Sequence, residues 1–175
     1  MVPSVSDDPL DPGLNEIVAA TGQAGLTLNL LCWGRLAQAK ELAGRHPDTQ
    51  IVIDHLGLQQ PFEPPCPPEP FAGLDEVVTL AELDNVAVKI TGACTLSAER
   101  FPFTDIWPGV HRLLDAFGLD RSMWGTDWTR AVELLTYREG VDAFSTSDEL
   151  SATDKDALMG GTLQSIYRWT PDVAG

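Results

Sequence analysis

Short runs of apolar residues alternate with longer amphipathic stretches along this chain. Four runs predict β-strands, at residues 26–31, 50–56, 86–92 and 122–128. Most of them are apolar on both faces, which is typical of strands in a parallel sheet covered by helices. Because strand and helix patterns alternate at regular intervals, the sequence predicts βαβ units and an α/β fold.

The stretches between these runs have the spacing of amphipathic helices. Residues 35–46, 73–83 and 107–118 predict one helix each. A last helix is expected to begin at Ser151, because Asp154 stands three residues later as in a capping box. The apolar positions on these helices are Leu36, Ala39, Leu42, Ala43, Leu74, Val77, Val78, Ala81, Trp107, Val110, Leu113, Leu114, Phe117, Leu158, Leu163 and Ile166.

Residues 61–70 form a segment of unusual composition, in which six of the ten residues are proline. Proline fixes φ and removes a backbone donor, so this segment is predicted to be an extended loop. Because it follows the strand that contains His55, two interpretations stay open, a stiff surface connector and a rim over a site. No repeat and no second domain is indicated, and residues 1–175 are expected to form a single domain.

Composition and charge argue against several classes of partner. The chain is 43% hydrophobic and 21% charged, and no apolar run is long enough to cross a bilayer. A net charge of −15 argues against nucleic acid and membranes as partners, since both bind clustered Lys and Arg. No leader sequence is evident, so we expect a cytoplasmic protein with reduced cysteines. Of these, Cys32 and Cys94 are expected to be buried and inert.

Titratable side chains stand at the ends of two predicted strands. Because side chains alternate along a strand, His55 should continue the core-facing row of Ile51 and Ile53, while Asp54 faces the other way. Asp127 ends the last strand in the same manner. Catalytic groups collect at the carboxyl edge of parallel sheets and barrels, so His55 and Asp127 are predicted to meet in one site.

The chemistry of such a site depends on a few side chains. An imidazole and a carboxylate, His55 and Asp127, can bind a divalent metal ion that activates water, or act as an acid/base pair without metal. Asp54 is a weak third ligand, because it should face away. Lys89 and Trp128 are predicted to contact the substrate. Cys94 could line the same pocket, and the amine of Lys89 could instead reach solvent.

These residues also carry a family resemblance. The blocks "VIDHLG", "VAVKITG" and "LDAFGLDRSMWGTDWT" resemble, in order and spacing, the later part of an amidohydrolase-related domain (amidohydrolase 2), a branch of the metal-dependent hydrolase superfamily. The resemblance extends from about Leu10 to Tyr167. Thr126 and Thr129 stand where the family usually has serine and proline in "WGSDWP", and "GGTLQSIY" stands where its closing helix usually carries an Asn-Ala pair.

The resemblance implies a (β/α)8 TIM barrel that hydrolyses small cyclic esters, amides or lactones, and some relatives decarboxylate aromatic-type acids. His55 would match the metal-binding or substrate-polarising histidine, and Asp127 the late aspartate that orients or deprotonates the attacking water. Relatives differ in whether they need a metal, so a zinc or manganese ion and a metal-free mechanism both stay open.

Part of that barrel is missing from this sequence. A TIM barrel takes about 250 residues and eight strands, whereas here we predict a partial barrel of about four to five βα units. The family's first strand carries a His-x-His pair, but the histidines here are His46, His55 and His111. We expect His46 to cap a helix at the surface and His111 to be structural. A catalytic zinc normally has about three protein ligands, and His55 and Asp127 are two.

Three explanations follow for the partial barrel, and the first is favoured. In the first, the chain is expected to be the C-terminal portion of a longer hydrolase, since its first residues read as a loop and helix without their strand. Alternatively, its unpaired sheet edge forms a homo-oligomer or pairs with a separate N-terminal half, or the chain is a non-catalytic binding module. The predicted function is hydrolysis of small carbonyl compounds, and whether the chain is active alone or inactive without the rest of the barrel stays open at this point. A decarboxylase of the same family is a further alternative.

Overall fold

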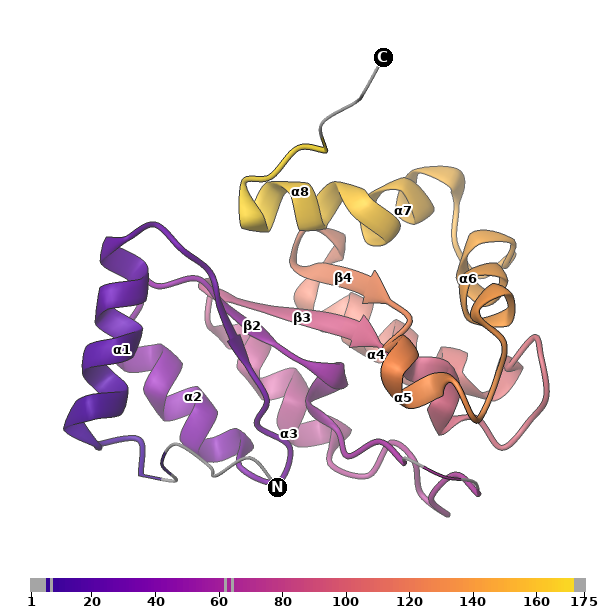
Figure 1. Cartoon of the computed structure of the whole chain (residues 1–175), viewed down its shortest axis with the longest axis horizontal. Helices are drawn as coiled ribbons and strands as arrows, with labels where there is room; N and C mark the ends of the chain where they lie inside the picture. Colours follow the sequence, from indigo (N-terminus) through magenta and orange to yellow (C-terminus); the bar gives the residue numbers. More distant parts are fainter. Residues whose placement is uncertain (1–5, 7, 62, 64, 172–175) are drawn as a thin grey trace.

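The centre of the molecule is a parallel sheet of four strands in the order β1-β2-β3-β4 (Figure 1). The computed structural model describes residues 6, 8–61, 63 and 65–171. The strands are β1 (Leu28–Leu30), β2 (Ile51–Ile53), β3 (Val86–Thr91) and β4 (Ser122–Gly125). The α/β pattern and the parallel arrangement are therefore confirmed. Each strand is shorter than predicted, because several polar residues at the strand ends belong to turns.

One face of the sheet packs against three helices, α2 (Leu36–Arg45), α3 (Leu74–Val78) and α4 (Trp107–Phe117). Alternate strand residues enter this core, and α2 buries all four of the side chains predicted for it. The α3 helix is shorter than predicted and continues as a 3-10 turn at Thr79–Glu82, which buries Leu80. Hydrophobic periodicity therefore identified which side of each helix faces the sheet.

The other face of the sheet packs against the last helix. Its buried residues are Val52, Ala87 and Met123, and the side chains that cover them from α8 (Thr162–Tyr167) are Leu163, Ile166 and Tyr167. The helical region begins at Ser151 with the predicted capping box. It is not one helix, however, because a wide π-type turn at Ala157–Gly161 separates α7 (Ala152–Asp156) from α8.

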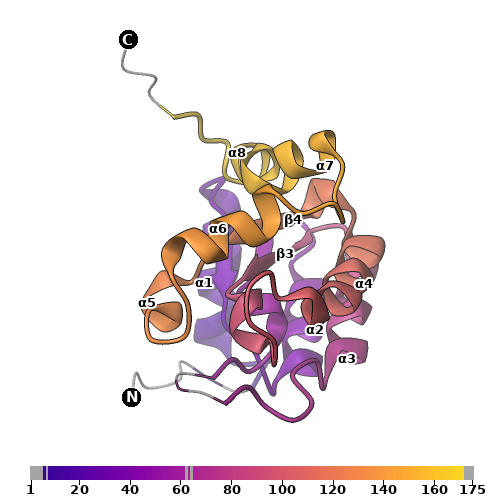
Figure 2. The same cartoon turned by 90° about the vertical axis from the view of Figure 1, so that its right-hand side faces the viewer.

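Three helices frame the ends of this arrangement. The α1 helix (Pro12–Gln23) is the helix expected near the start, and the side chain of Asp11 caps it by accepting from the Leu14 N–H. The α5 (Trp128–Ala131) and α6 (Tyr137–Ser145) helices were not predicted. Figures 1 and 2 show α5 and α6 beyond the carboxyl end of β4.

Two further predictions concern the proline-rich segment and the cysteines. Residues 61, 63 and 65–70, the described part of that segment, contain neither helix nor strand. Cys32 and Cys94 are buried, as predicted, and burial raises the pKa of each thiol to about 12. None of the helices in the described part of the chain combines the length and the apolar character needed to cross a membrane.

Candidate active site at the carboxyl edge of the sheet

Polar side chains gather where β2, β3 and β4 end, and the backbone there is unusual. His55 and Leu56 follow β2 with φ angles of 54° and 58°, and Asp127 follows β4 with a φ of 50°. Residues other than glycine adopt this left-handed conformation rarely. Such conformations persist where the surroundings enforce them, and they cluster at functional sites.

These turns bring His55 and Asp127 into contact. His55 Nδ1 lies 3.2 Å from Asp127 Oδ2 and 3.1 Å from Thr91 Oγ1 at the end of β3. The backbone N–H of His55 donates to the same Thr91 hydroxyl. Arg130 belongs to α5, and its Nε lies 3.2 Å from Asp127 Oδ2. The side chains of His55, Asp127 and Arg130 are 21%, 11% and 14% exposed, so the charges interact in a partly desolvated space.

The way in which His55 reaches this contact differs from the prediction. Ile51 and Ile53 face the helices, as expected for a core-facing row. His55 does not continue that row, because β2 ends at Ile53 and the left-handed turn directs the imidazole to Thr91. Side-chain alternation holds only while the backbone stays extended.

Two residues of this site were missed by the sequence analysis, Arg130 and Gln60. Gln60 is 2% exposed, and its Nε2 donates to the Thr91 carbonyl at 2.6 Å. The backbone carbonyl of Gln60 accepts a hydrogen bond from Arg130 Nη1 at 3.1 Å. The spacing of three residues between Asp127 and Arg130 on a helix could have identified Arg130. No local pattern marks Gln60, which precedes the proline-rich segment.

Lys89 lies on the sheet face that α8 covers. Its Nζ is 3.0 Å from Asp54 Oδ1 and donates to Asn29 Oδ1 at 2.8 Å, and it lies 5.6 Å from the ring centre of Tyr167. Burial alone would lower the pKa of Lys89, but the hydrogen bonds and charge of Asp54, with a smaller contribution from Tyr167, raise it above its ordinary value. Asp54 therefore pairs with Lys89.

The remaining residues considered in the sequence analysis have other surroundings. Trp128 directly follows Asp127, but the residue is 36% exposed, and its ring packs edge-on against Tyr137 with the ring centres 5.5 Å apart. Cys94 is buried in the hydrophobic core. His46 Nε2 bonds to Asn15 at the end of α2, and the residue is half-buried rather than exposed. His111 pairs with Glu149 on the surface.

The described residues do not complete a metal site. Among them, no group of three or more His, Cys, Asp and Glu side chains has an arrangement that could hold a metal ion. A catalytic zinc normally takes about three protein ligands. In addition, Asp127 Oδ2 is already close to the guanidinium of Arg130, which a cation would have to displace or tolerate.

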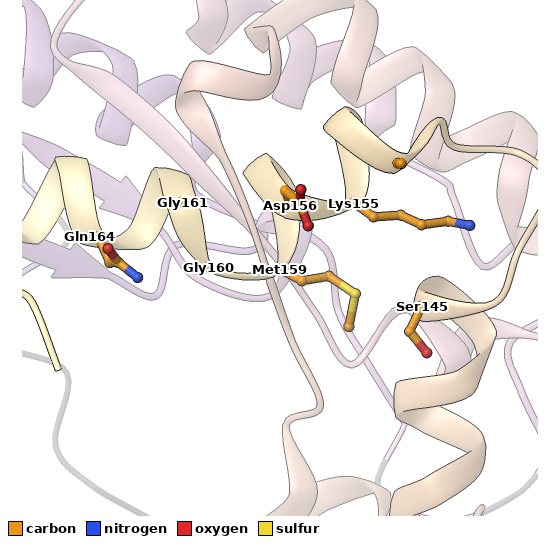
Figure 3. A pocket seen from close by; sticks show the side chains of 8 residues that line it. Ser145, Lys155, Asp156, Met159, Gly160, Gly161 and Gln164 are labelled. Atoms are coloured by element: carbon orange, nitrogen blue, oxygen red, sulfur yellow. The ribbon is translucent and has the colours of Figure 1, made fainter. Parts of the chain in front are cut away.

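A cavity of about 520 Å³ lies away from this cluster, beside α7 and α8 (Figure 3). Its lining includes Ser145, Lys155, Met159 and the glycines of the π-type turn, and none of the site residues described above. Its polar side chains are exposed or half-buried. No buried side-chain oxygen or nitrogen in this lining lacks a hydrogen-bond partner. The carboxyl edge of the sheet is therefore the candidate site.

Several known proteins are similar to this chain in sequence. A family model described as amidohydrolase matches residues 2–169. The 4-sulfomuconolactone hydrolase from Rhizobium radiobacter is 35% identical over 132 residues, which are 73% of this chain and 35% of that protein. An L-fucono-1,5-lactonase from Burkholderia multivorans is 28% identical over 141 residues, which are 76% of this chain and 48% of that protein. The chain thus spans between about a third and a half of these relatives.

Solved structures identify the fold. A crystal structure of an amidohydrolase from Burkholderia multivorans with bound zinc matches with a TM-score of 0.78 and 23% identity, over 93% of this chain and 59% of that one. The four parallel strands and their helices therefore have the architecture of a partial TIM-type barrel. In such barrels the carboxyl edge of the strands carries the active site.

Proposed function

Because this chain belongs to the amidohydrolase family, we propose that it carries the proton-transfer part of an active site that hydrolyses small carbonyl compounds, above all lactones. The observation that carries the proposal is the contact of 3.2 Å between His55 Nδ1 and Asp127 Oδ2 at the carboxyl edge of the sheet. The names of two relatives, a lactone hydrolase and a lactonase, favour lactones among the candidate substrates.

In this proposal Asp127 is the base. Its carboxylate takes a proton from a water molecule while the water oxygen bonds to the lactone carbonyl carbon. The ring C–O bond then breaks, the leaving oxygen takes up that proton, and a hydroxy acid results. His55 and Arg130 hold the carboxylate from two sides, and Thr91 holds His55 through its ring and its backbone N–H.

No step of this mechanism needs a metal ion. The described residues offer His55 and Asp127 as donors, so a zinc or manganese ion would need further ligands from elsewhere. Lys89 and Trp128 are proposed to contact the substrate from the sheet face and from α5, respectively.

Turnover of two lactones tests the proposal directly. Purified chain should open L-fucono-1,5-lactone or 4-sulfomuconolactone faster than buffer does, with one acid formed for each ring opened. Asp127→Asn should lower kcat by about 10²- to 10⁴-fold, the usual contribution of a general base. The matched control is Asp115→Asn, an exposed carboxylate on α4, which should leave kcat unchanged.

Equal rates for the wild-type chain and Asp127→Asn would contradict the role of Asp127. Absence of any lactone opening by the wild-type chain would contradict the proposal for this chain by itself. Release of carbon dioxide from an aromatic acid in place of ring opening would favour the decarboxylase alternative.

A second candidate function is assembly through the sheet edges. Among the described strands, β1 and β4 each pair with one neighbour, which leaves an unpaired edge on both sides. Open parallel edges favour pairing with another chain. We propose that two copies associate through these edges, so light scattering should report a dimer whose mass His55→Ala does not change. A monomer at every concentration measured would exclude this function.

A further inference from the structure

The two outer strands of the sheet differ in what lies beside them. β4 contacts α8 and the π-type turn at Ala157–Gly161, and both views show α7 and α8 on the side of β4 away from β3 (Figures 1 and 2). A helix that covers an outer strand keeps other chains from pairing with it. In β1, by contrast, Asn29 is exposed, and Leu31 directly after the strand is 55% exposed. The outer side of β1, here called the β1 edge, is therefore the side open to another strand.

The backbone of β1 presents unpaired hydrogen-bonding groups on this side. The Leu28 N–H donates to the carbonyl of the residue before β2, and the Leu30 carbonyl accepts from the N–H of the residue after β2. Both leucines thus direct their backbone groups to β2. Asn29 stands between them, so its N–H and carbonyl face the opposite side. Neither group has a hydrogen-bond partner in the part of the chain that the structure describes.

Thr27 and Leu31 extend this row at both ends. Their backbone groups also make no hydrogen bond to another described residue. If the strand is lengthened by one residue at each end, these groups face the same side as those of Asn29. Free N–H and carbonyl groups in a row are a template for a further strand. The row is symmetric, with Asn29 at its centre.

The side chains of this stretch fit a second copy of the chain. Residues 26–34, "LTLNLLCWG", contain no charged residue and no proline, although the chain has a net charge of −15. Two copies can therefore meet here without placing like charges against each other. Charged side chains and proline are also the usual devices that keep free edges apart, and this edge has neither. Leu26 and Trp33 are 63% and 43% exposed and add apolar surface beside it.

We infer that the β1 edge docks onto the same edge of a second copy, with antiparallel β1 strands and a two-fold axis through Asn29. A two-fold interface places the same surface on both copies. Donors then meet acceptors only if the strands are antiparallel. In this register Asn29 exchanges both backbone hydrogen bonds with Asn29 of the second copy, and Thr27 pairs with Leu31. The inference rests on the edge association proposed above and adds which edge, which register and which partner.

This dimer differs from a barrel closed by two copies. A closed barrel requires β4 to pair with β1 of the second copy, but α8 and the π-type turn cover β4. Antiparallel β1 strands place the carboxyl edges of the two sheets at opposite ends. Each cluster of His55 and Asp127 then stays within one chain, so lactone hydrolysis per chain should be equal in monomer and dimer.

Hydrogen exchange of the wild-type chain over a dilution series tests the docking surface. The amides of Thr27, Asn29 and Leu31 should exchange at least about tenfold more slowly where light scattering reports a dimer than in the monomer, because hydrogen bonding protects them. The amide of Trp124 in β4 is the control and should not change.

The outcomes separate the inference from the association on which it rests. A monomer at every concentration would overturn both. A dimer in which the three amides are not slowed would overturn the β1 edge alone, because the copies would then meet elsewhere. Slower exchange of Trp124 as well would indicate pairing of β4 with β1 and would overturn the antiparallel register.

Asn29→Asp tests the register. The substitution keeps the oxygen that accepts from Lys89 and Tyr167, but places two carboxylates opposite each other across the two-fold axis. It should raise the dissociation constant of the dimer about fivefold at low ionic strength, and less at high salt, which screens the repulsion. Gln59→Glu adds the same charge at an exposed position and should leave this constant unchanged. Equal dissociation constants for the two variants would overturn the register.

Discussion

The two edges of the sheet differ in how completely their polar groups are hydrogen-bonded. At the amino edge, two side chains satisfy many backbone carbonyls at once. Asn85 Nδ2, just before β3, donates to the carbonyls of Ala43, His46 and Thr49. The guanidinium of Arg121, just before β4, donates to the carbonyls of Ala81, Leu83, Val86 and Phe117. These bonds join the ends of helices and strands into one unit.

At the carboxyl edge, the corresponding groups are left incomplete. Among the described residues, no contact with hydrogen-bond geometry reaches the buried Gln60 Oε1 or Asp127 Oδ2, although Asp127 Oδ2 has two ion-pair contacts, and His55 and Asp127 adopt left-handed backbone conformations. Both features are unfavourable for the chain alone. The contrast is the one expected if the amino edge stabilises the fold and the carboxyl edge holds the proposed site, as the two ends of a TIM barrel do.

The largest effect on stability is expected from removing the guanidinium at the amino edge. Arg121→Met should lower the free energy of unfolding by about 3 kcal/mol, because it leaves several buried carbonyls without a donor. Urea unfolding of both proteins measures the difference. Arg112→Met, which removes an exposed partner of Asp75, should change the free energy of unfolding by less than about 0.5 kcal/mol. Equal effects of the two substitutions would remove the basis for the contrast between the edges.

A smaller loss is expected at the neighbouring amino-edge position. Asn85→Ala should lower the free energy of unfolding by about 1.5 kcal/mol, since one amide group now serves three carbonyls. Asp84→Ala, at an exposed position next to it, is the control and should have little effect. If both substitutions were neutral, Asn85 would not join α2 to the sheet as the contacts indicate.

The carboxyl edge should respond in the opposite manner. Thr91→Val removes the hydroxyl that holds His55 but keeps the shape of the side chain. We expect the free energy of unfolding to change by less than about 1 kcal/mol, while lactone hydrolysis slows about tenfold because His55 loses its orientation. Urea unfolding and initial rates on the same preparations separate the two effects. A large loss of stability would place Thr91 with the stabilising edge.

The smallest effect is expected from pH acting on Lys89. Its pKa is raised in the folded chain by Asp54, so the pair stabilises the fold at pH values below the ordinary lysine pKa. That contribution is lost as the pH rises through the higher folded-state pKa. The difference in unfolding free energy between wild type and Lys89→Met should therefore be constant near neutral pH and shrink above about pH 10.4.

A pH series of urea titrations measures this change. Lys40→Met is the control, because Lys40 pairs with the well-exposed Glu82. A difference for Lys89→Met that grows with rising pH would contradict the raised pKa.

Local patterns were sufficient to predict much of the fold. All four buried residues of α2 were predicted, since hydrophobic spacing depends on neighbours within two turns. The α6 helix was missed, although Thr136 and Glu139 form a capping box that the sequence displays. The break between α7 and α8 was missed because the apolar spacing of Leu158, Leu163 and Ile166 continues through it.

The candidate site could be predicted only in part. His55 and Asp127 were identified because each follows an apolar strand, and parallel strands bring their carboxyl ends to one edge. Gln60 was not identified, because a glutamine before a proline-rich segment has no pattern that distinguishes it from the exposed Gln59.

The sequence by itself determined the strands, most helices and the edge at which titratable groups collect, since periodicity and strand direction are local properties of the chain. Only the tertiary structure decided which groups meet there. The left-handed turns at His55 and Asp127 bring these two side chains into contact, and the bare backbone of Gly92 lies against both Gln60 and Asp127. Those positions depend on packing between segments distant in sequence, which no local pattern encodes.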